Sequence, residues 1–137
     1  MNLTSKYPRS PRQRLAGLVH VPRMIDKARA CKENTLGEYI YPCPLDKQIL
    51  EFLNVDSDAF MDKASTLPEA TIEEWVEYLV QSKSRRDFEK INESILNASP
   101  DTDDAKRKFK DILNSIDRNR FDITSWAELI DLEEGRM

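Results

Sequence analysis

The sequence predicts an all-α fold: a single compact domain of six to eight short helices with an irregular extended segment near residues 34–44. Apolar residues recur mostly three or four positions apart, which places them on one face of a helix. Only three glycines occur, and no second convincing strand is available to form a sheet. The 137 residues are enough for one hydrophobic core, so residues 1–137 are predicted as one domain, with residues 1–8 as a flexible N-terminal arm.

The first predicted helix begins near residue 10. Ser10 is a favourable N-cap, and Pro11 suits the first helical position. The apolar residues that follow at helical spacing are Leu15, Leu18, Val19 and Pro22. Pro22 breaks the pattern, so it either kinks this helix or begins a second one. In both cases Asp26 and Arg29 lie one turn apart, near the packed face, where they are expected to pair.

Six further helices are predicted from caps and apolar spacing. In order, they begin at Pro44, at Asp56 or Ser57, at Thr71, at Ser84, in the acidic turn 101–104 and at Ser125. Thr71 with Glu74 and Ser125 with Glu128 match the capping box, in which two side chains satisfy free backbone N–H groups. Residues 34–44 are expected as an ordered loop laid across the helices, with a short strand possible only at 39–41.

Charge is distributed unevenly along the chain. The net charge is −4, but residues 1–32 carry eight lysines and arginines against one acid, a local charge of +7. Such a segment either docks on the protein's own acidic surface or binds an anionic partner. The acidic character of the rest of the chain disfavours general binding to duplex nucleic acid, which requires a broad basic surface.

Several classes of protein are disfavoured by composition. No apolar run approaches the roughly 20 residues of a membrane span, and residues 1–12 lack the apolar stretch of a secretory signal, so a cytoplasmic protein without membrane contact is expected. Cys31 and Cys43 are predicted as reduced thiols, because one pair without a CxxC motif is no disulfide framework. Three isolated glycines exclude a phosphate-binding loop, so no cofactor is predicted.

A metal site is not predicted either. The aspartate clusters fail as calcium loops at the positions where glycine and glutamate are needed. His20 with Cys31 or Cys43 and a carboxylate could bind zinc, but nothing in the spacing selects this combination. A Cys–His nucleophilic pair remains an alternative, because the sequence does not establish proximity. We expect His20 on the polar face of a helix.

The basic segment is the first candidate site. The residues predicted to bind an anionic ligand or partner are Arg9, Arg12, Arg14, His20, Arg23 and Lys27. The planar guanidinium groups suit carboxylate or phosphate, so an anionic small molecule or an acidic protein is the expected partner. The alternative is internal pairing with acids near the end of the sequence: Asp122, Glu128, Asp131, Glu133 and Glu134.

Several sequence blocks carry a family resemblance. The blocks PRSPRQRLAGLVHVPRMIDKARA, TLGEYIYPCPLDKQILEFLNVD and DITSWAELIDLEEG follow one another between Tyr7 and Gly135. They resemble the bacterial family known as domain of unknown function 5069. The resemblance implies no reaction or cofactor, but it directs attention to residues 8–12, 22–29, 37–39, 43–46 and 126–131. Ala127 departs from the pattern, in which an aromatic residue is expected after the tryptophan.

Three functions are compatible with the sequence, and it does not decide whether the protein is an enzyme. The favoured one is a non-enzymatic binding or adaptor protein that uses the basic segment. A small enzyme is the first alternative, with a pocket formed by Asp26, Arg29, Tyr39, Cys43 and Asp46. The second alternative is a structural subunit of a larger assembly, which would expose an apolar patch.

Overall fold

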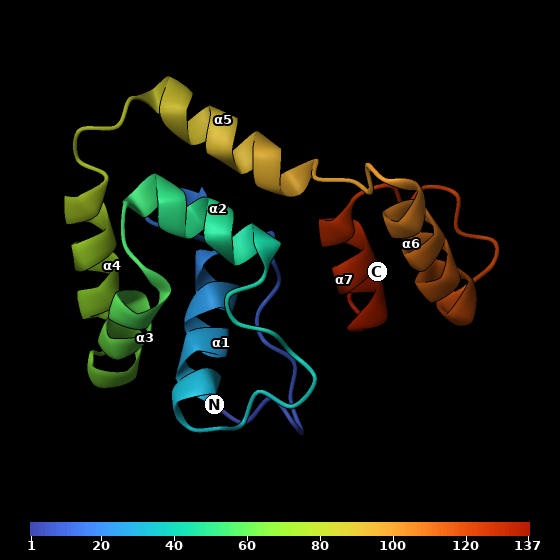
Figure 1. Cartoon of the computed structure of the whole chain (residues 1–137). Coiled ribbons are helices and arrows are strands. Elements are labelled where there is room, and N and C mark those ends of the chain that lie inside the picture. Colours follow the sequence, from blue (N-terminus) through green and yellow to red (C-terminus); the bar gives the residue numbers. More distant parts are fainter.

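The computed structural model covers residues 1–137 and contains seven helices and one very short hairpin (Figure 1). The elements in chain order are β1 (Arg14–Leu15), β2 (Leu18–Val19), α1 (Val21–Lys32), α2 (Pro44–Leu53), α3 (Ser57–Thr66), α4 (Glu69–Leu79), α5 (Arg85–Leu96), α6 (Asp103–Ile116) and α7 (Trp126–Glu133). The predicted mostly α-helical fold class is confirmed.

The hairpin and helices α1–α5 form the main body. Helix α1 lies among the other elements of this body (Figure 1). It is buried over most of its length, with Val21, Met24, Ile25 and Ala28 fully inaccessible. The other helices each add a fully buried apolar side chain: Ile49 of α2, Phe60 of α3, Ile72 of α4 and Ile95 of α5. The resulting core contains 17 buried apolar residues. The apolar residues that recur at helical spacing in the sequence therefore pack into one continuous core.

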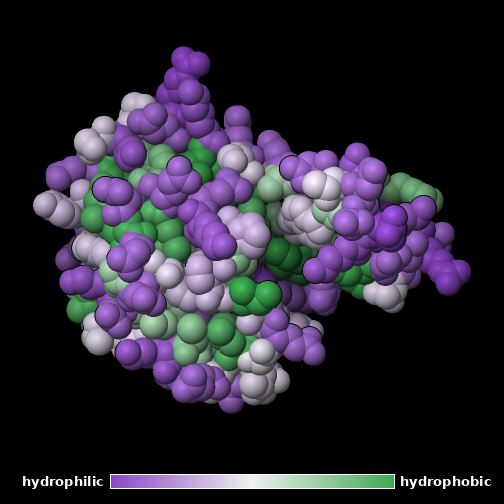
Figure 2. Space-filling model, in the orientation of Figure 1, coloured by the Kyte–Doolittle hydropathy of each residue, from purple (hydrophilic) through white to green (hydrophobic).

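Helices α6 and α7 form a smaller C-terminal lobe that projects from the main body (Figures 1 and 2). Its own core has four buried residues: Phe109, Ile123, Leu129 and Leu132. The Phe109 and Trp126 rings meet edge to face with their centroids 5.0 Å apart. Figure 2 shows mostly hydrophilic side chains over both parts on this face. None of the seven helices combines the length and apolarity needed to cross a bilayer.

The helix predicted from residue 10 is wrong, because residues 14–19 form a hairpin instead. Arg14 pairs with Val19 and Leu15 with Leu18. The two turn residues, Ala16 and Gly17, have φ angles of 53° and 81°, as the tight turn of a two-residue hairpin requires. The apolar residues at helical spacing are still buried, because a short hairpin can present them to the same core.

A buried amide from α5 holds the hairpin in place. The Asn92 side chain accepts a hydrogen bond from the Val19 N–H at 3.0 Å and donates one to the Gly17 carbonyl at 2.9 Å. These bonds satisfy backbone groups that a two-stranded hairpin leaves free. The hairpin is thus fixed by a residue more than 70 positions away, which no local sequence pattern reveals.

Helix α1 begins at Val21 with Pro22 in its first turn, so the alternative in which Pro22 begins a helix is correct. His20 precedes this helix in a left-handed backbone conformation, with φ 74°. It is completely buried, and the prediction that it lies on a polar helix face is wrong. The pairing expected between Asp26 and Arg29 is also absent. Arg29 instead donates to the Ala64 carbonyl near the end of α3, at 2.9 Å.

The six further helices are all present. Asp56, Ser84 and Ser125 act as N-caps, and Ser125 forms the predicted capping box with Glu128. Helix α4 differs: it begins at Glu69 behind Pro68 rather than at Thr71, because the proline already fixes the backbone that precedes a first turn.

Residues 34–43 form no strand and connect α1 to α2 as a loop. The N-terminal residues pack against this loop. Leu3 is buried, and its N–H donates to the Thr35 carbonyl at 2.8 Å.

Candidate functional site

A cluster of four chemically active side chains lies where α1 meets the start of α2. Cys43 is the N-cap of α2, and Asp46 stands three residues later in a capping box with it. His20 is the N-cap of α1, and Lys27 lies two turns further along that helix. We call His20, Lys27, Cys43 and Asp46 the thiol cluster. Two helix starts position three of its members.

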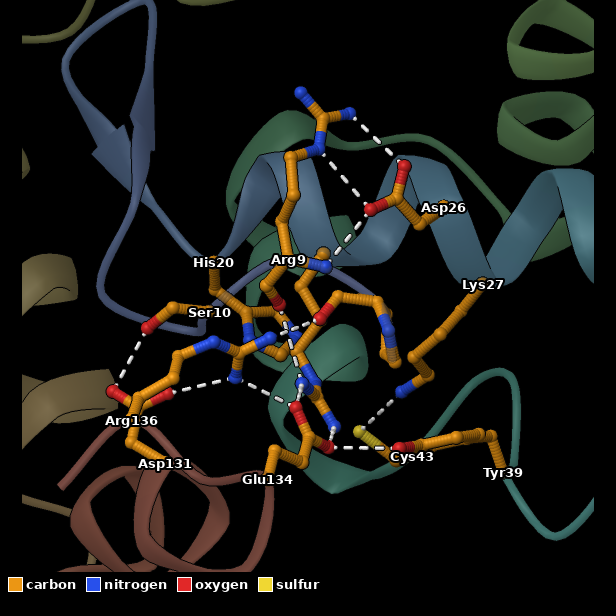
Figure 3. A network of polar contacts seen from close by, with 12 residues as sticks. Arg9, Ser10, His20, Asp26, Lys27, Tyr39, Cys43, Asp131, Glu134 and Arg136 are labelled. Atoms are coloured by element: carbon orange, nitrogen blue, oxygen red, sulfur yellow. Dashed lines mark hydrogen bonds and ion pairs between the residues drawn. The ribbon is translucent and has the colours of Figure 1, made fainter. Parts of the chain in front are cut away.

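Asp46 is the centre of the thiol cluster. One of its oxygens lies 2.6 Å from His20 Nε2, and the other lies 2.6 Å from Lys27 Nζ. The second oxygen also accepts the Cys43 backbone N–H at 2.8 Å. Lys27 Nζ is in turn 3.1 Å from Cys43 Sγ, a contact drawn in Figure 3. The His20 and Asp46 side chains are fully buried, and that of Lys27 is 3% exposed.

These contacts move the pKa values of three groups. Burial alone would raise the pKa of Asp46, but the hydrogen bond with His20 and the Lys27 ammonium hold it well below its ordinary value. Burial opposes the charged imidazole, yet Asp46 and Cys43 raise the pKa of His20. Burial likewise opposes a thiolate, but His20 and Lys27 lower the pKa of Cys43. Each of these three shifts is in the direction that favours the charged form of its group.

One atom of the thiol cluster has no partner. His20 Nδ1 is buried and makes no hydrogen bond. An unsatisfied buried polar atom costs about 1–3 kcal/mol, so natural proteins rarely keep one without a use. The ligand-capable atoms of His20, Cys43 and Asp46 all lie within 4.8 Å of one another. Nδ1 is thus the free end of an imidazole whose other end is fixed by a carboxylate.

Cysteine, histidine and aspartate are also zinc ligands. In this arrangement, however, both Asp46 oxygens already accept hydrogen bonds, and the Lys27 ammonium lies against Asp46 and Cys43. A metal ion bound by these residues would have to displace Lys27 against its attraction to the carboxylate. The donor set suits a metal less well than its composition suggests.

A second polar network joins the basic segment to the C-terminal lobe (Figure 3). Arg23 of α1 forms two parallel hydrogen bonds with Glu134, at 2.8 and 2.9 Å, and both side chains are only 5% exposed. Tyr39 donates its hydroxyl to the same carboxylate at 2.9 Å. Burial and the negative Glu134 carboxylate raise the pKa of Tyr39 above its ordinary range, so this hydroxyl stays protonated.

Asp131 of α7 is the other anchor of this network. It accepts hydrogen bonds from Ser10 Oγ at 2.8 Å, Arg12 Nε at 2.7 Å and Arg136 at 2.9 Å, and it is almost completely buried. We call the residues of this network the clasp: Ser10, Arg12, Arg23, Asp131, Glu134 and Arg136. The clasp connects residues separated by more than 100 positions in the sequence.

The clasp also shows where the predicted acids lie. Of the five acids named as internal partners, Asp131 and Glu134 pair with the basic segment. Asp122 pairs with Arg120, and Glu128 accepts the free N–H groups at the start of α7.

The six residues predicted to bind an anion are dispersed. His20 and Lys27 belong to the thiol cluster, and Arg12 and Arg23 to the clasp. Arg9 pairs with Asp26 at 3.1 Å and contacts Glu69 of α4. Arg14 is exposed in β1. Most of the positive charge near the N-terminus is therefore neutralised internally, and anion binding there remains a prediction.

The five residues of the predicted pocket separate as well. Cys43 and Asp46 lie together, whereas Tyr39 contacts the clasp and Arg29 contacts α3. His20 and Lys27 join Cys43 and Asp46 in the thiol cluster, but the sequence analysis assigned neither of them to this pocket. Their seven-residue spacing is the one signal that could have placed them together, because it puts them on one side of a helix two turns apart.

A comparison with known protein families matches nearly the same part of the chain as the sequence blocks. The family described as "Domain of unknown function (DUF5069)" matches residues 5–136, so the chain belongs to this family. No curated protein matches the chain.

Proposed function

We propose that the protein is a small enzyme in which Cys43 is a nucleophile, His20 its acid–base partner and Asp46 the group that orients the imidazole. The observation that carries this proposal is a buried imidazole with Nε2 fixed on Asp46 at 2.6 Å and Nδ1 without a partner, in a cluster whose ligand-capable atoms, Cys43 Sγ included, lie within 4.8 Å of one another. A nucleophile, a base and an orienting carboxylate are the parts of a catalytic triad.

The surroundings of Cys43 support a reactive thiolate. The thiolate, not the thiol, is the nucleophile, and a positive environment stabilises it. Here Lys27 Nζ is 3.1 Å from Sγ, and Cys43 caps the N-terminus of a ten-residue helix, where the helix dipole favours negative charge. Cys43 is half-buried rather than enclosed, so part of its surface is open to a substrate.

The chemistry that fits these groups is acyl transfer. The Cys43 thiolate would add to an electrophilic carbonyl carbon, and the His20 imidazolium would give its proton to the leaving group. The resulting thioester would be hydrolysed by a water molecule whose proton returns to neutral His20. Asp46 keeps the imidazole in one orientation during both steps, as the carboxylate does in known triads.

Alkylation of the folded protein tests the nucleophile. We expect iodoacetamide at pH 7 to modify Cys43 faster than Cys31, as resolved by peptide mass spectrometry, because the Lys27 ammonium 3.1 Å from Sγ stabilises the reactive thiolate. His20→Gln should slow the reaction at Cys43 but not at Cys31. Equal rates at the two cysteines in the folded protein would contradict the proposal.

Activity gives the second test. A panel of activated esters and thioesters should be hydrolysed by the wild-type protein and by Cys31→Ser, the matched control. Cys43→Ser should lose this hydrolysis while keeping its circular dichroism spectrum and melting temperature. Equal turnover by Cys43→Ser and the wild type would remove acyl transfer from consideration.

Binding of an anion by the basic segment is a second candidate, favoured by one cleft. Arg12 lines an open cleft of about 530 Å³ together with Ser99 and Thr124. Only its Nε pairs with Asp131, so its terminal nitrogens are free to bind a carboxylate or phosphate. Phosphate titration at low salt should raise the melting temperature of the wild type but not that of Arg12→Gln. Equal shifts in both proteins would exclude this cleft.

A further inference from the structure

We propose that peroxide joins Cys43 to Lys27 through a covalent sulfur–nitrogen bond, which makes this pair a reversible oxidation site. The inference rests on the proposed nucleophilic thiolate and adds a second reaction of the same sulfur. It follows from one contact: the amine of Lys27 lies 3.1 Å from Cys43 Sγ in a place where it has little freedom.

The position of Lys27 is unusual for a lysine. Its side chain is 3% exposed, and Asp46 holds Nζ at 2.6 Å. Lysine side chains are rarely buried to this degree, because their charge is costly to remove from water. Asp46 also accepts the Cys43 N–H, so a single carboxylate fixes both reacting residues. The nitrogen and the sulfur are therefore held in contact before any reaction occurs.

The reaction balances with hydrogen peroxide as the oxidant. The thiolate attacks one peroxide oxygen and forms sulfenic acid, and the hydroxide released takes a proton from the Lys27 ammonium to give water. The neutral amine then attacks the sulfenic sulfur, and the sulfenic hydroxyl leaves as a second water with a proton from the amine. In sum, thiolate, ammonium and one peroxide give a sulfenamide and two waters, with sulfur oxidised and peroxide reduced.

Lys27 is favoured over other partners of the sulfenic acid. Sulfenic acids condense with a neighbouring thiol or nitrogen, and the nearest correctly placed group reacts first. Cys31 lies one helical turn beyond Lys27, and both cysteines are free thiols, so a disulfide is the competing product. Lys27 Nζ already lies 3.1 Å from Cys43 Sγ, whereas the two cysteines form no disulfide.

The bond would switch off the proposed nucleophile and protect it. It removes the thiolate and the lysine charge together, and it covalently joins α1 to the start of α2. Two equivalents of a small thiol reverse it, returning Cys43 and Lys27 and leaving a small-molecule disulfide. The bond also prevents further oxidation to sulfinic acid, which is irreversible for most proteins.

The experiment uses the full chain carrying Cys31→Ser, so that no internal disulfide can form. After treatment with hydrogen peroxide, the intact mass should fall by two hydrogen atoms. Digestion should yield one linked species that contains the peptides of Lys27 and Cys43, and dithiothreitol should separate them. Addition of oxygen atoms at Cys43 without a link would overturn the proposal. A wild-type product that is only a Cys31–Cys43 disulfide would overturn it as well.

Two lysine variants provide the matched comparison. Lys27→Arg keeps the positive charge beside Asp46 but lacks a primary amine, so it should give no link and should instead label with dimedone, which traps sulfenic acid. Lys32→Arg changes an exposed lysine of the same helix and should form the link normally. Should Lys27→Arg fail to fold, the digestion of Cys31→Ser alone still decides the outcome. Rapid alkylation of Cys43 without a link overturns this inference and leaves the proposed nucleophile intact.

Discussion

The main body and the C-terminal lobe are stabilised in different ways. The body buries 17 apolar residues in one core, and each of its five helices contributes to it. The lobe has four buried apolar residues of its own and is attached to the body largely through the ion pairs of the clasp, of which Arg23–Glu134 is buried on both sides. Ile130 of α7 adds one partly buried apolar contact with the larger core.

Because of this difference, folding of the body and docking of the lobe depend on different interactions. Apolar burial involves no charged group, whereas ion pairs are screened by salt and are lost when their carboxylates are protonated. The body should therefore determine whether the chain folds, and the clasp should determine how long the lobe stays docked. The thiol cluster lies within the body, but Arg23 and Lys27, one turn apart on α1, bring it next to the clasp.

The largest effect should come from the core of the body. Phe60→Ala removes a fully buried ring and should reduce the free energy of unfolding by about 3–5 kcal/mol, as measured by urea denaturation. Phe121→Ala removes a ring that is 86% exposed and should change it by less than about 0.5 kcal/mol. Similar losses for both variants would mean that burial does not distinguish these sites.

A local effect is expected at the clasp. Glu134→Gln leaves Arg23 buried without its counter-ion and should cost about 1.5–3 kcal/mol. Hydrogen exchange should accelerate in α6 and α7 while the amides of α3 and α4 keep their rates, because only the lobe undocks. Glu133→Gln is the matched control, because Glu133 is the next residue in the chain and its side chain is exposed. Uniform acceleration across all helices would show that body and lobe unfold as one unit.

A smaller effect, dependent on pH, is expected for Glu69. Its hydrogen bond with Arg9 lowers the pKa of Glu69, so its contribution to stability is present above the unfolded value of about 4.3 and is lost as the pH falls through the folded value. Because solvent screens this pair, Glu69→Gln should cost less than about 1 kcal/mol at pH 7. The difference in the free energy of unfolding between Glu69→Gln and the wild type should vanish at low pH. A difference that grows on acidification would have the wrong sign.

The smallest effect should come from an exposed pair in the body. Arg85 and Glu89 are one turn apart on α5, with 94% and 59% of their side chains exposed. Glu89→Ala should change the free energy of unfolding by less than about 0.5 kcal/mol, and 0.5 M salt should abolish even that. A loss as large as that of Glu134→Gln would show that burial is not what makes the clasp strong.

Sequence reasoning succeeded where structure is local. The helices after residue 43 follow from caps such as Ser84 and Ser125, whose partners lie three residues away. It failed at residues 10–20, because helical spacing and a short hairpin both bury Leu15, Leu18 and Val19. The hairpin depends on Asn92, and a contact across more than 70 residues leaves no trace in a local pattern.

The candidate site could be predicted only in part for the same reason. Cys43 and Asp46 are three residues apart and could be assigned to one place from the sequence. His20 and Lys27 join them only because α1 crosses the start of α2, and this packing is decided by the whole core. The positive charge of the basic segment was evident, and its partners Asp131 and Glu134 are among the acids expected to pair with it, but the sequence did not select these two.

The clasp has a consequence for synthesis of the chain. Arg12 and Arg23 leave the ribosome more than 100 residues before the acids that pair with them. Residues 1–96 already contain every residue of the larger core, so the body can fold during translation while these arginines are still unpaired. Closing so long a loop is slow, and the lobe should therefore dock last. Until then, the nascent protein carries Arg12 and Arg23 without the two carboxylates that neutralise them in the finished protein.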